Sequence, residues 1–440
     1  MADIIVAGAG HGGLGAAALL AKQGHRVTVL EKNARENMGY DWTDIFDKKG
    51  LFAVGLDLPE EGKYALKNDM TFVCPSGEHR LRQHTPADQL EIQMERKDLY
   101  DMLIAHAQEC GAALQFATEV LGPVMLGSRV AGVRTKDGPV YADLVIDACG
   151  ACSPVRSQLP SYLGIPREAA KYEIFYVYRA FYERTAPMPE DNFKVLLLHN
   201  NILGISWVAA EEAHTDVLIG RFEPFGMEEV ETELASLRAE CPELGEKRLR
   251  GGQFVKIPVR QAAEVMVADG YAAIGDAAFM TVPLIGSGIA NSLKAAKMLA
   301  EAVQADRDGA FTAQTLYAYQ KAFFSSLGAG LAPIACVKLM LTKLTSQEVD
   351  YLFGSGILNE MDVTMGADTT SIFSMTKGMD PLSLKIKASG LIKDKALLKK
   401  ISWMVGRIAS AVSVGAAMPK VYSRTALAAW AKAYRKCFEV

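Results

Sequence analysis

The chain has 440 residues, half of them hydrophobic, with a net charge of −4 and seven cysteines. The length and apolar content predict a globular protein of two or three domains and exclude a disordered or fibrous chain. We expect no nucleic-acid partner, and the odd number of scattered cysteines argues against a disulfide framework.

The apolar segments do not have the features of a signal sequence or a membrane span. The first apolar run reaches glycine after only a few residues. The longest apolar candidate that we identify, residues 401–418, contains Arg407. We therefore expect a cytoplasmic protein.

The first thirty residues have the pattern of a strand, a glycine turn, a helix and a second strand. Gly8, Gly10 and Gly13 form the G-x-G-x-x-G spacing, which lets the backbone approach a pyrophosphate at a helix N-terminus. Glu31 ends the second strand, where a carboxylate can accept hydrogen bonds from ribose hydroxyls. This segment predicts a site for a dinucleotide, either FAD or NAD. The residues expected to line it are Gly8, Gly10, His11, Gly12, Gly13, Glu31 and Lys32.

A second strand–turn–helix unit lies between residues 269 and 303. Residues 271–274 predict a buried strand, and a glycine-rich loop then opens a long helix at about Ile289. The amides of this second helix N-terminus can point at a ligand. An enzyme that binds only NAD has no need of such a unit, so it favours FAD. The residues expected at this part of the site are Gly275, Asp276, Pro283, Gly286, Ser287, Gly288 and Ile289.

The pattern G-D-A-A-x-x-x-x-P-x-x-G-x-G-I, from Gly275 to Ile289, resembles the FAD-binding signature of the geranylgeranyl reductase-like flavoproteins. These proteins are relatives of para-hydroxybenzoate hydroxylase and of the flavin halogenases. The resemblance implies that Asp276 binds the ribityl chain or the pyrophosphate of FAD. It also implies that the loop 283–289 lies against the isoalloxazine ring.

Further segments extend the resemblance over residues 1–50, 90–156 and 255–305. Arg96, just before an amphipathic helix, matches the family arginine that reaches the FAD phosphates. The backbone near Val120 matches the strand that meets the adenine. After the strand "ADLVIDACG", Gly150 matches a turn glycine of the FAD site. Cys149 stands where the family has Asp or Thr.

The resemblance and the element pattern together predict an α/β protein, α+β overall. We expect a Rossmann-like FAD-binding domain, an antiparallel-sheet substrate domain and a C-terminal helical region. The expected boundaries are 1–65, 90–156 and 255–325 for the discontinuous FAD-binding domain, 66–89 and 157–254 for the substrate domain, and 326–440 for the helical region. Within the last region, Gly328 to Gly330 are expected to break a helix.

Sequence differences between the branches of this superfamily favour a reductase. A hydroxylase usually has His after G-D-A-A, where this chain has Phe279, and the halogenase segment W-x-W-x-I-P is missing. We therefore expect an FAD-dependent oxidoreductase that reduces C=C bonds of an isoprenoid or other lipid-like substrate, with hydride from N5 of reduced flavin. The main competing hypothesis is a flavin-dependent monooxygenase that hydroxylates an aromatic or polyketide substrate.

Two further hypotheses depend on cysteines. A flavin electron carrier with an iron–sulfur cluster would need four ligands, but only Cys336 and Cys437 lie in the last hundred or so residues. We expect no metal site. The C-x-x-C pair Cys149 and Cys152 would suit a dithiol oxidoreductase, but that class needs a second nucleotide motif, which we do not find. The electron source is accordingly NAD(P)H bound transiently or a ferredoxin-type donor.

The substrate side departs from the resembled family. Trp207 is kept from the family strand Y-x-W-x-F-P, but Ser206 and Ala210 replace an aromatic residue and proline, and Phe279 replaces a glycine. We expect these changes to lie where the substrate would meet the flavin. No acid–base pair stands out, and the weak catalytic candidates are Asp41 and Asp44, as proton donors, and Trp207, as a cavity wall.

The C-terminal segment is basic. Residues 381–440 have twelve Lys and Arg against Asp394 and Glu439, a net +10, which leaves −14 on the remainder. Around Leu391 to Lys400, lysines alternate with apolar positions. Such a helix could lie on an anionic membrane surface, which would suit a lipid substrate. A helical cap packed on the FAD-binding domain is the other interpretation.

Overall fold

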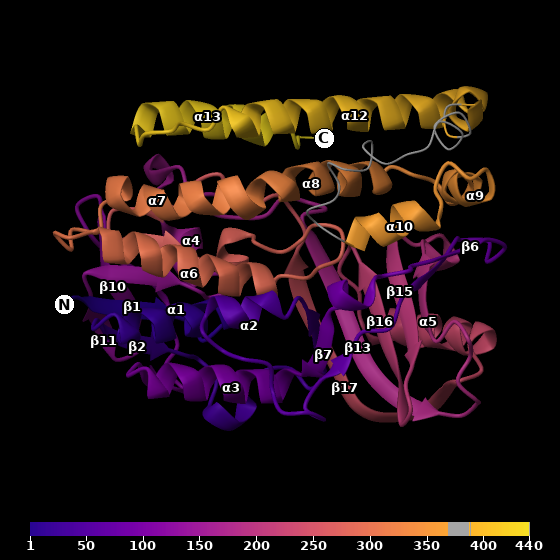
Figure 1. Cartoon of the computed structure of the whole chain (residues 1–440), viewed down its shortest axis with the longest axis horizontal. Helices are drawn as coiled ribbons and strands as arrows, with labels where there is room; N and C mark the ends of the chain where they lie inside the picture. Colours follow the sequence, from indigo (N-terminus) through magenta and orange to yellow (C-terminus); the bar gives the residue numbers. More distant parts are fainter. Residues whose placement is uncertain (368–386, 388, 440) are drawn as a thin grey trace.

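The computed structural model describes residues 1–367, 387 and 389–439. Part of the basic segment, residues 381–386, 388 and 440, lies outside the described residues. The described chain forms two sheet-containing bodies side by side beneath a layer of helices (Figure 1). One sheet is mostly parallel and the other mostly antiparallel. The predicted α/β architecture with C-terminal helices is therefore confirmed.

The mostly parallel sheet joins strands from distant parts of the chain, in the order β18-β19-β12-β1-β2-β8. Its strands are β1 (Asp3–Ala7), β2 (Arg26–Leu30), β8 (Ala113–Gln115), β12 (Leu144–Asp147), β18 (Val267–Ala268) and β19 (Tyr271–Ala273). All except β18 run parallel. Their carboxyl ends consequently meet at one edge, which is where open parallel sheets bind ligands.

Small residues let the helices of this body pack closely. Helix α1 (His11–Lys22) packs against α3 (Arg96–Glu109) and α6 (Ile289–Ala305). A Cβ at Gly15 would lie only 2.9 Å from Cγ1 of Val54. The glycines and alanines of α1 thus reflect tight helix packing as well as the turn before it.

Shorter elements complete this body. Helices α2 (Lys49–Ala53) and α4 (Pro154–Gln158) are each one turn or so long. A three-stranded sheet is made of β9 (Gly122–Leu126), β10 (Arg129–Thr135) and β11 (Gly138–Tyr141), and another of β3 (Thr43–Phe46), β4 (Ala65–Leu66) and β7 (Ile92–Glu95).

The second body is a seven-stranded sheet in the order β17-β13-β16-β15-β14-β5-β6, in which only β14 and β5 pair in parallel. Its strands are β5 (Thr71–Val73), β6 (Arg80–Arg82), β13 (Ile174–Arg184), β14 (Phe193–Leu197), β15 (Gly204–Ala210), β16 (His214–Arg221) and β17 (Leu244–Pro258). Side chains alternate between its faces. Tyr178 packs with Leu234 of α5 (Met227–Glu240), whereas Val177 and Leu218 form a cluster on the opposite face.

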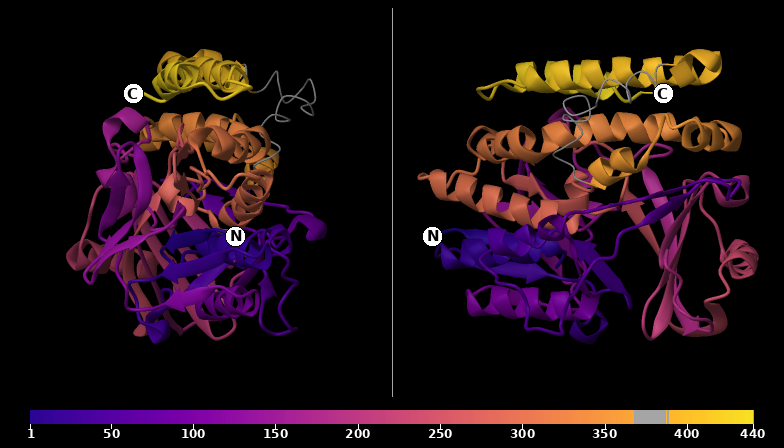
Figure 2. Two further views of the ribbon diagram at one scale, coloured as in Figure 1. Left: turned by 90° about the vertical axis from the view of Figure 1, so that its left-hand side faces the viewer. Right: turned by 45° about the vertical axis from the view of Figure 1, so that its right-hand side comes forward.

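The C-terminal helices lie across both bodies, as the two views of Figure 2 agree. They are α7 (Ala313–Phe323), α8 (Ala329–Leu341), α9 (Ser346–Gly354), α10 (Glu360–Ala367), α12 (Lys395–Ala416) and α13 (Arg424–Lys436). Helix α12 packs on α8. The side of α12 that faces α8 is packed as the helical-cap interpretation expects, while other side chains of this helix are exposed.

The predicted helix break at Gly328 to Gly330 is wrong. A π-helical segment, Phe324–Gly328, joins α7 to α8 without a turn, and Gly328 has helical dihedral angles. A Cβ at Gly328 would lie 3.0 Å from Cδ1 of Phe324. This glycine serves close packing inside a helix, which local sequence rules do not distinguish from a turn.

The continuous helix Ala313–Leu341 does not coincide with the apolar run at residues 401–418. Within the described residues it alone is long and apolar enough to cross a membrane, by length and composition only. Inside the protein, 61% of its most apolar window is buried, as in the core helix of a folded domain.

A candidate cofactor and substrate site

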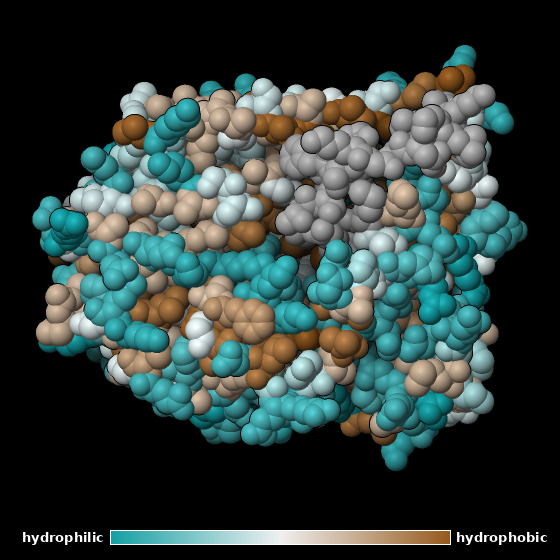
Figure 3. Space-filling view, in the orientation of Figure 1, coloured by the Kyte–Doolittle hydropathy of each residue, from teal (hydrophilic) through white to brown (hydrophobic). Residues whose placement is uncertain are grey.

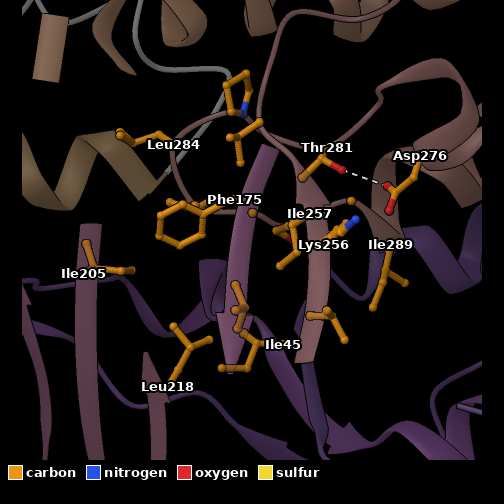
Figure 4. A pocket seen from close by; sticks show the side chains of 18 of the residues that line it. Ile45, Phe175, Ile205, Leu218, Lys256, Ile257, Asp276, Thr281, Leu284 and Ile289 are labelled. Atoms are coloured by element: carbon orange, nitrogen blue, oxygen red, sulfur yellow. Dashed lines mark hydrogen bonds between the residues drawn. The ribbon is translucent and has the colours of Figure 1, made fainter. Parts of the chain in front are cut away.

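A cavity of about 1040 Å³ runs from the carboxyl edge of the parallel sheet to the underside of the C-terminal helices. At one end it is lined by the segments that follow β1, β2, β12 and β19. One face of the seven-stranded sheet forms its middle. Figure 4 shows Phe175, Ile205 and Ile257 on strands of this sheet, with Leu284 of the loop 283–289 above them.

Most residues predicted from the sequence line this cavity. They are Gly8, Gly10, His11, Gly12, Gly13, Glu31, Lys32, Asp44, Arg96, Val120, Gly150, Trp207, Gly275, Asp276, Pro283, Gly286, Ser287, Gly288 and Ile289. Among the residues predicted to bind the cofactor or to take part in catalysis, Asp41 is the exception. Its carboxylate accepts hydrogen bonds from Arg250 Nη1 and from the Gly251 amide, each at 3.2 Å, and it does not line the cavity.

The glycine turn is compressed against the end of β12. Gly8 has φ +89°, and a Cβ there would lie 2.6 Å from the carbonyl oxygen of Ala148. Gly10 is the N-cap of α1, and within the described chain no side chain caps this helix end. The first amides of α1 are therefore available to an anionic ligand.

Glu31 is held in place by two backbone amides. Oε2 accepts a hydrogen bond from the Ala9 amide at 2.9 Å, and Oε1 accepts one from the Asn33 amide at 2.8 Å. The carboxylate is buried, but each oxygen keeps a lone pair for a further donor. It can thus receive hydroxyl groups beside the glycine turn.

Asp276 and the loop 283–289 form the opposite wall. The Thr281 hydroxyl donates to Asp276 Oδ1 at 2.8 Å, as Figure 4 shows, and burial raises the pKa of Asp276. A Cβ at Gly288 would lie 2.9 Å from Thr281 Oγ1. Glycine at this position consequently keeps the loop close to the aspartate.

Asp44 and Arg96 form an ion pair beside the glycine turn. Arg96 Nη2 donates to Asp44 Oδ1 at 2.6 Å, and its guanidinium lies 5.0 Å from the Tyr40 ring centroid and 5.1 Å from that of Trp42. Asp44 is buried in β3, not in a surface loop. Its carboxylate holds the guanidinium of Arg96, which lines the cavity.

Three buried polar atoms at or near this ion pair have no hydrogen-bond partner in the described part of the chain: Trp42 Nε1, His11 Nε2 and Asp44 Oδ2. The last two lie 3.9 Å apart. Burial lowers the pKa of His11 to about 4, so the ring is neutral near pH 7. Buried polar groups are normally satisfied, and these two therefore fit a polar ligand in the cavity.

The cysteine pair does not have the features of a redox dithiol. Cys149 and Cys152 are free thiols, and Cys149 Sγ donates to the Ala7 carbonyl at 3.2 Å. Burial raises the pKa of the Cys149 thiol well above its usual value, which opposes the thiolate needed for exchange. The turn is a structural wall of the site.

Asp147 anchors that turn, and sequence reasoning missed it. This fully buried carboxylate accepts hydrogen bonds from the hydroxyls of Ser153, at 2.6 Å, and Tyr271, at 2.9 Å. It also accepts from the Cys149 amide at 3.1 Å. An acid at the end of the predicted strand, just before the cysteine turn, was the available signal.

The expectation that Ser206 and Ala210 meet the substrate is wrong. The Ser206 hydroxyl donates to Glu233 on α5, behind the sheet, and neither residue lines the cavity. Trp207, the next residue along β15, does line it. The alternation of side chains along a strand separates these neighbours.

The expectation for Phe279 is wrong for a different reason. Its ring is fully buried, with the guanidinium carbons of Arg156 and Arg260 at 4.3 and 4.6 Å from its centroid, and it does not line the cavity. Phe279 also has φ +55°, outside the conformation that residues with a Cβ prefer. Phe279 supports the turn after Asp276 on the side away from the cavity.

The apolar end of the cavity lies among the C-terminal helices, which the sequence did not assign to any site. Its apolar lining residues there include Met340, Leu341, Leu344, Val349, Leu352, Phe353, Ile357, Leu358, Ile401 and Met404. They come from α8, α9, α12 and the segments between them. The sequence showed that these residues lie on helices, but it did not show that they line one cavity.

A dinucleotide turn, a second helix N-terminus and a facing antiparallel sheet together define a nucleotide-binding flavoprotein fold. The family described as "FAD binding domain" matches residues 1–322, and the chain belongs to this family. Within it, the resemblance to the geranylgeranyl reductase-like flavoproteins is confirmed, and the protein is an FAD-dependent oxidoreductase.

Curated relatives carry reductase names. The digeranylgeranylglycerophospholipid reductase of Haloferax volcanii is 26% identical over 324 residues, which are 68% of this chain and 74% of that protein. The protein of the same name from Sulfolobus acidocaldarius is 22% identical over 420 residues, 91% of each chain.

Solved structures share the fold. A geranylgeranyl bacteriochlorophyll reductase-like protein from Thermoplasma acidophilum has a TM-score of 0.71 at 20% identity, over 92% of this chain and 99% of that one. PqsL, a probable FAD-dependent monooxygenase from Pseudomonas aeruginosa, has a TM-score of 0.59 at 22% identity, over 80% of this chain and 99% of that one.

Substitution of Gly8 tests the glycine turn. We expect Gly8→Ala to lose FAD, because the added Cβ would collide with the Ala148 carbonyl. The measurement is flavin absorbance of the purified protein, with thermal unfolding to verify that the variant folds. Gly24→Ala is the matched control, since Gly24 has φ +90° and nothing within 4 Å of the added Cβ. Equal FAD content in both folded variants would refute the close approach.

Replacement of both cysteines tests the structural role of the C-x-x-C turn. We expect a Cys149→Ser, Cys152→Ser variant to bind FAD and to keep turnover, because Cys149 is held as a protonated thiol. The measurements are FAD content and reductase rate. A variant that keeps its FAD but has no turnover would restore the dithiol hypothesis.

Proposed function

We propose that the protein reduces C=C bonds of an isoprenoid or other lipid-like substrate that occupies the apolar part of the cavity. The observation that carries the proposal is the continuity of this cavity from the glycine turn to the C-terminal helices. The reductase names of the curated relatives support it. A long apolar cavity suits an extended hydrocarbon chain better than a single aromatic ring.

The residues of the parallel-sheet edge fit FAD. We propose that Glu31 receives the ribose hydroxyls, that the amides at the start of α1 and Arg96 receive the phosphates, and that Asp276 and the loop 283–289 hold the ring end. The unpartnered His11 Nε2 agrees with a polar ligand there. When bound, the flavin would supply hydride to one carbon of the double bond, and the other carbon would take a proton from solvent or from a side chain.

The protein chain would position the alkene and keep bulk water away from it. Phe175, Trp207 and Ile257 present apolar surface to the middle of the cavity, which would hold an alkene in a fixed orientation. The buried Arg179 also lines this region, but Asp216 neutralises it with contacts of 2.6 and 2.9 Å. An isolated alkene has no carbonyl to polarise, so this wall needs no acid–base pair.

We assign Asp44 to positioning and not to proton transfer. Its Oδ1 receives two hydrogen bonds from Arg96, at 2.6 and 3.1 Å, which hold the two side chains together. Trp207 serves as a cavity wall. We leave Asp41 outside the reaction because its carboxylate is bonded to Arg250.

Electrons for the flavin would come from a transient donor, either NAD(P)H or a ferredoxin-type protein. The chain has one G-x-G-x-x-G turn of the dinucleotide type, and the proposed FAD site uses it. Comparison of the two donors in a stopped-flow flavin-reduction assay would choose between them.

Product mass separates reduction from hydroxylation. We expect the FAD-bound protein, chemically reduced without oxygen, to convert a geranylgeranyl lipid to products heavier by two hydrogen atoms per reduced double bond. The measurement is mass spectrometry of the extracted lipid, with oxidised protein as the control. Gain of one oxygen atom from dioxygen when NAD(P)H supplies the electrons, with no reduction of a double bond, would favour a monooxygenase like the one named among the structural relatives.

We also propose that α12 contacts an anionic membrane surface. Its neighbourhood exposes apolar side chains, with Ile392 69%, Val405 55% and Val421 78% exposed. Figure 3 shows hydrophobic residues along the upper edge of the molecule, where α12 lies. Ile401 and Met404 of the same helix line the cavity, so a lipid drawn from the membrane would have a short path into the site.

Flotation on vesicles tests this contact. We expect wild-type protein to float with vesicles that contain phosphatidylglycerol. Charge reversal of three exposed lysines, Lys393→Glu, Lys395→Glu and Lys399→Glu, should reduce the bound fraction about tenfold or more, at about 1 kcal/mol per lysine.

The control for flotation reverses three exposed lysines elsewhere on the chain. These are Lys97→Glu, Lys136→Glu and Lys247→Glu, which change the net charge by the same amount. An equal loss in both triple variants would show that net charge, and not α12, governs binding. Absence of flotation by the wild type would end the membrane proposal.

A further inference from the structure

Lys338 places a buried ammonium group on the wall of the apolar cavity. The residue lies on α8 and is only 3% exposed, yet it lines the cavity. Around it the lining is apolar, with Met340 and Leu341 on the same helix. A charged group in such surroundings is costly unless it is paired, so its partners decide what it does.

The ammonium group has one hydrogen-bond acceptor among the described residues. Nζ donates to the Tyr172 carbonyl at 2.7 Å, which leaves two N–H groups of the ammonium without a described acceptor. The Phe222 ring, whose centroid lies 5.8 Å from Nζ, also lines the cavity. No carboxylate of the described chain lies within 4 Å of Nζ.

Each of the other cations among the described lining residues is either paired with a carboxylate or exposed to solvent. Lys387 is paired with Asp362, whereas Lys32 and Lys256 are exposed. Arg179 is paired with Asp216, and Lys67 is paired with Glu91 at 3.3 Å. Arg96 is paired with Asp44 at the nucleotide end. Lys338 is thus a cation in the apolar part of the cavity without a carboxylate partner of its own.

Two charged groups, Glu173 and Arg260, influence the Lys338 ammonium. Before β13, Glu173 raises its pKa; after β17, Arg260 lowers it and is itself paired with Glu173 at 3.3 Å. On α12, which packs on α8, Lys400 is bonded to Glu348 and Arg407 to the Lys436 carbonyl. Burial is the largest influence and lowers the pKa of Lys338 to about 8.

We propose that Lys338 binds the anionic head group, a phosphate, of the lipid substrate and so fixes how far the chain enters the cavity. A phosphate would supply the acceptors that the two remaining N–H groups lack. The ammonium, in turn, would offset the cost of burying the phosphate. This inference rests on the proposed function, because it names the class of substrate for that same cavity.

Binding of two matched probes tests the inference without turnover. The probes are geranylgeranyl phosphate and geranylgeraniol, titrated into the full-length FAD-bound protein by isothermal calorimetry. We expect the phosphate to bind at least about tenfold more tightly than the alcohol. Lys338→Met should abolish this preference and leave the affinity for the alcohol unchanged, whereas Lys338→Arg should keep it.

Lys343→Met is the matched control. Lys343 follows α8 and is exposed, its Nζ lies 4.5 Å from the Trp403 ring centroid, and it does not line the cavity. This variant should keep the preference for the phosphate.

In the wild type the preference for the phosphate should persist at pH 7 and decline as the pH rises above about 8, because Lys338 then loses its proton. Affinity for the alcohol should not follow this pH dependence.

Three outcomes would overturn the inference. They are a preference that survives in Lys338→Met, an equal loss of affinity for both probes, and competition by inorganic phosphate as strong as by the prenyl phosphate, which would indicate a free-phosphate site. The experiments distinguish failure of the head-group proposal from failure of the reductase proposal. Reduction of geranylgeraniol without any preference for the phosphate would contradict the head-group site alone. Tight binding of geranylgeranyl phosphate without reduction would contradict the reductase activity alone.

Discussion

At the carboxyl ends of β1 and β12, two backbones approach so closely that a methyl group on Gly8 would lie 2.6 Å from the Ala148 carbonyl oxygen. The parallel pairing of these strands causes this approach, since both must turn at the same edge of the sheet. Asp147 stabilises the arrangement from within the sheet by accepting hydrogen bonds from Ser153 and Tyr271. The start of α1, the Cys149 turn and Gly275 all take their places around this contact.

Charge inside the cavity is distributed along its length. At the nucleotide end, Arg96 and the amides of α1 can receive phosphate groups, and Glu31 can receive hydroxyls. In the middle, the pairing of Arg179 with Asp216 leaves an essentially apolar wall beside Trp207. This gradient of polarity would orient a flavin and a hydrocarbon chain in one continuous space, as we propose, and each would exclude water from the other.

The family resemblance predicted the cofactor end of the site better than the substrate end. Each glycine that was predicted to bind the cofactor in the two nucleotide segments lines the cavity, because the role of such a glycine is defined by neighbours close in sequence. Ser206 and Phe279 were expected at the substrate and lie behind the wall instead. Gly328 was expected in a turn and lies within a helix. In these cases packing between elements distant in sequence decided where the residue lies. A local sequence motif does not encode such packing.

By itself, the sequence determined the fold class, the FAD-binding segments and the reductase branch, because glycine turns, helix starts and strand ends are local and have fixed spacings. Only the tertiary structure decided which face of β15 meets the cavity. It also decided that Asp44 holds Arg96 and that α8 and α12 complete the apolar end. The position of Lys338 was likewise decided by the tertiary structure. Its helix lies far in sequence from the nucleotide segments, and the burial of a lysine follows from what packs around it, not from its own neighbours in the chain.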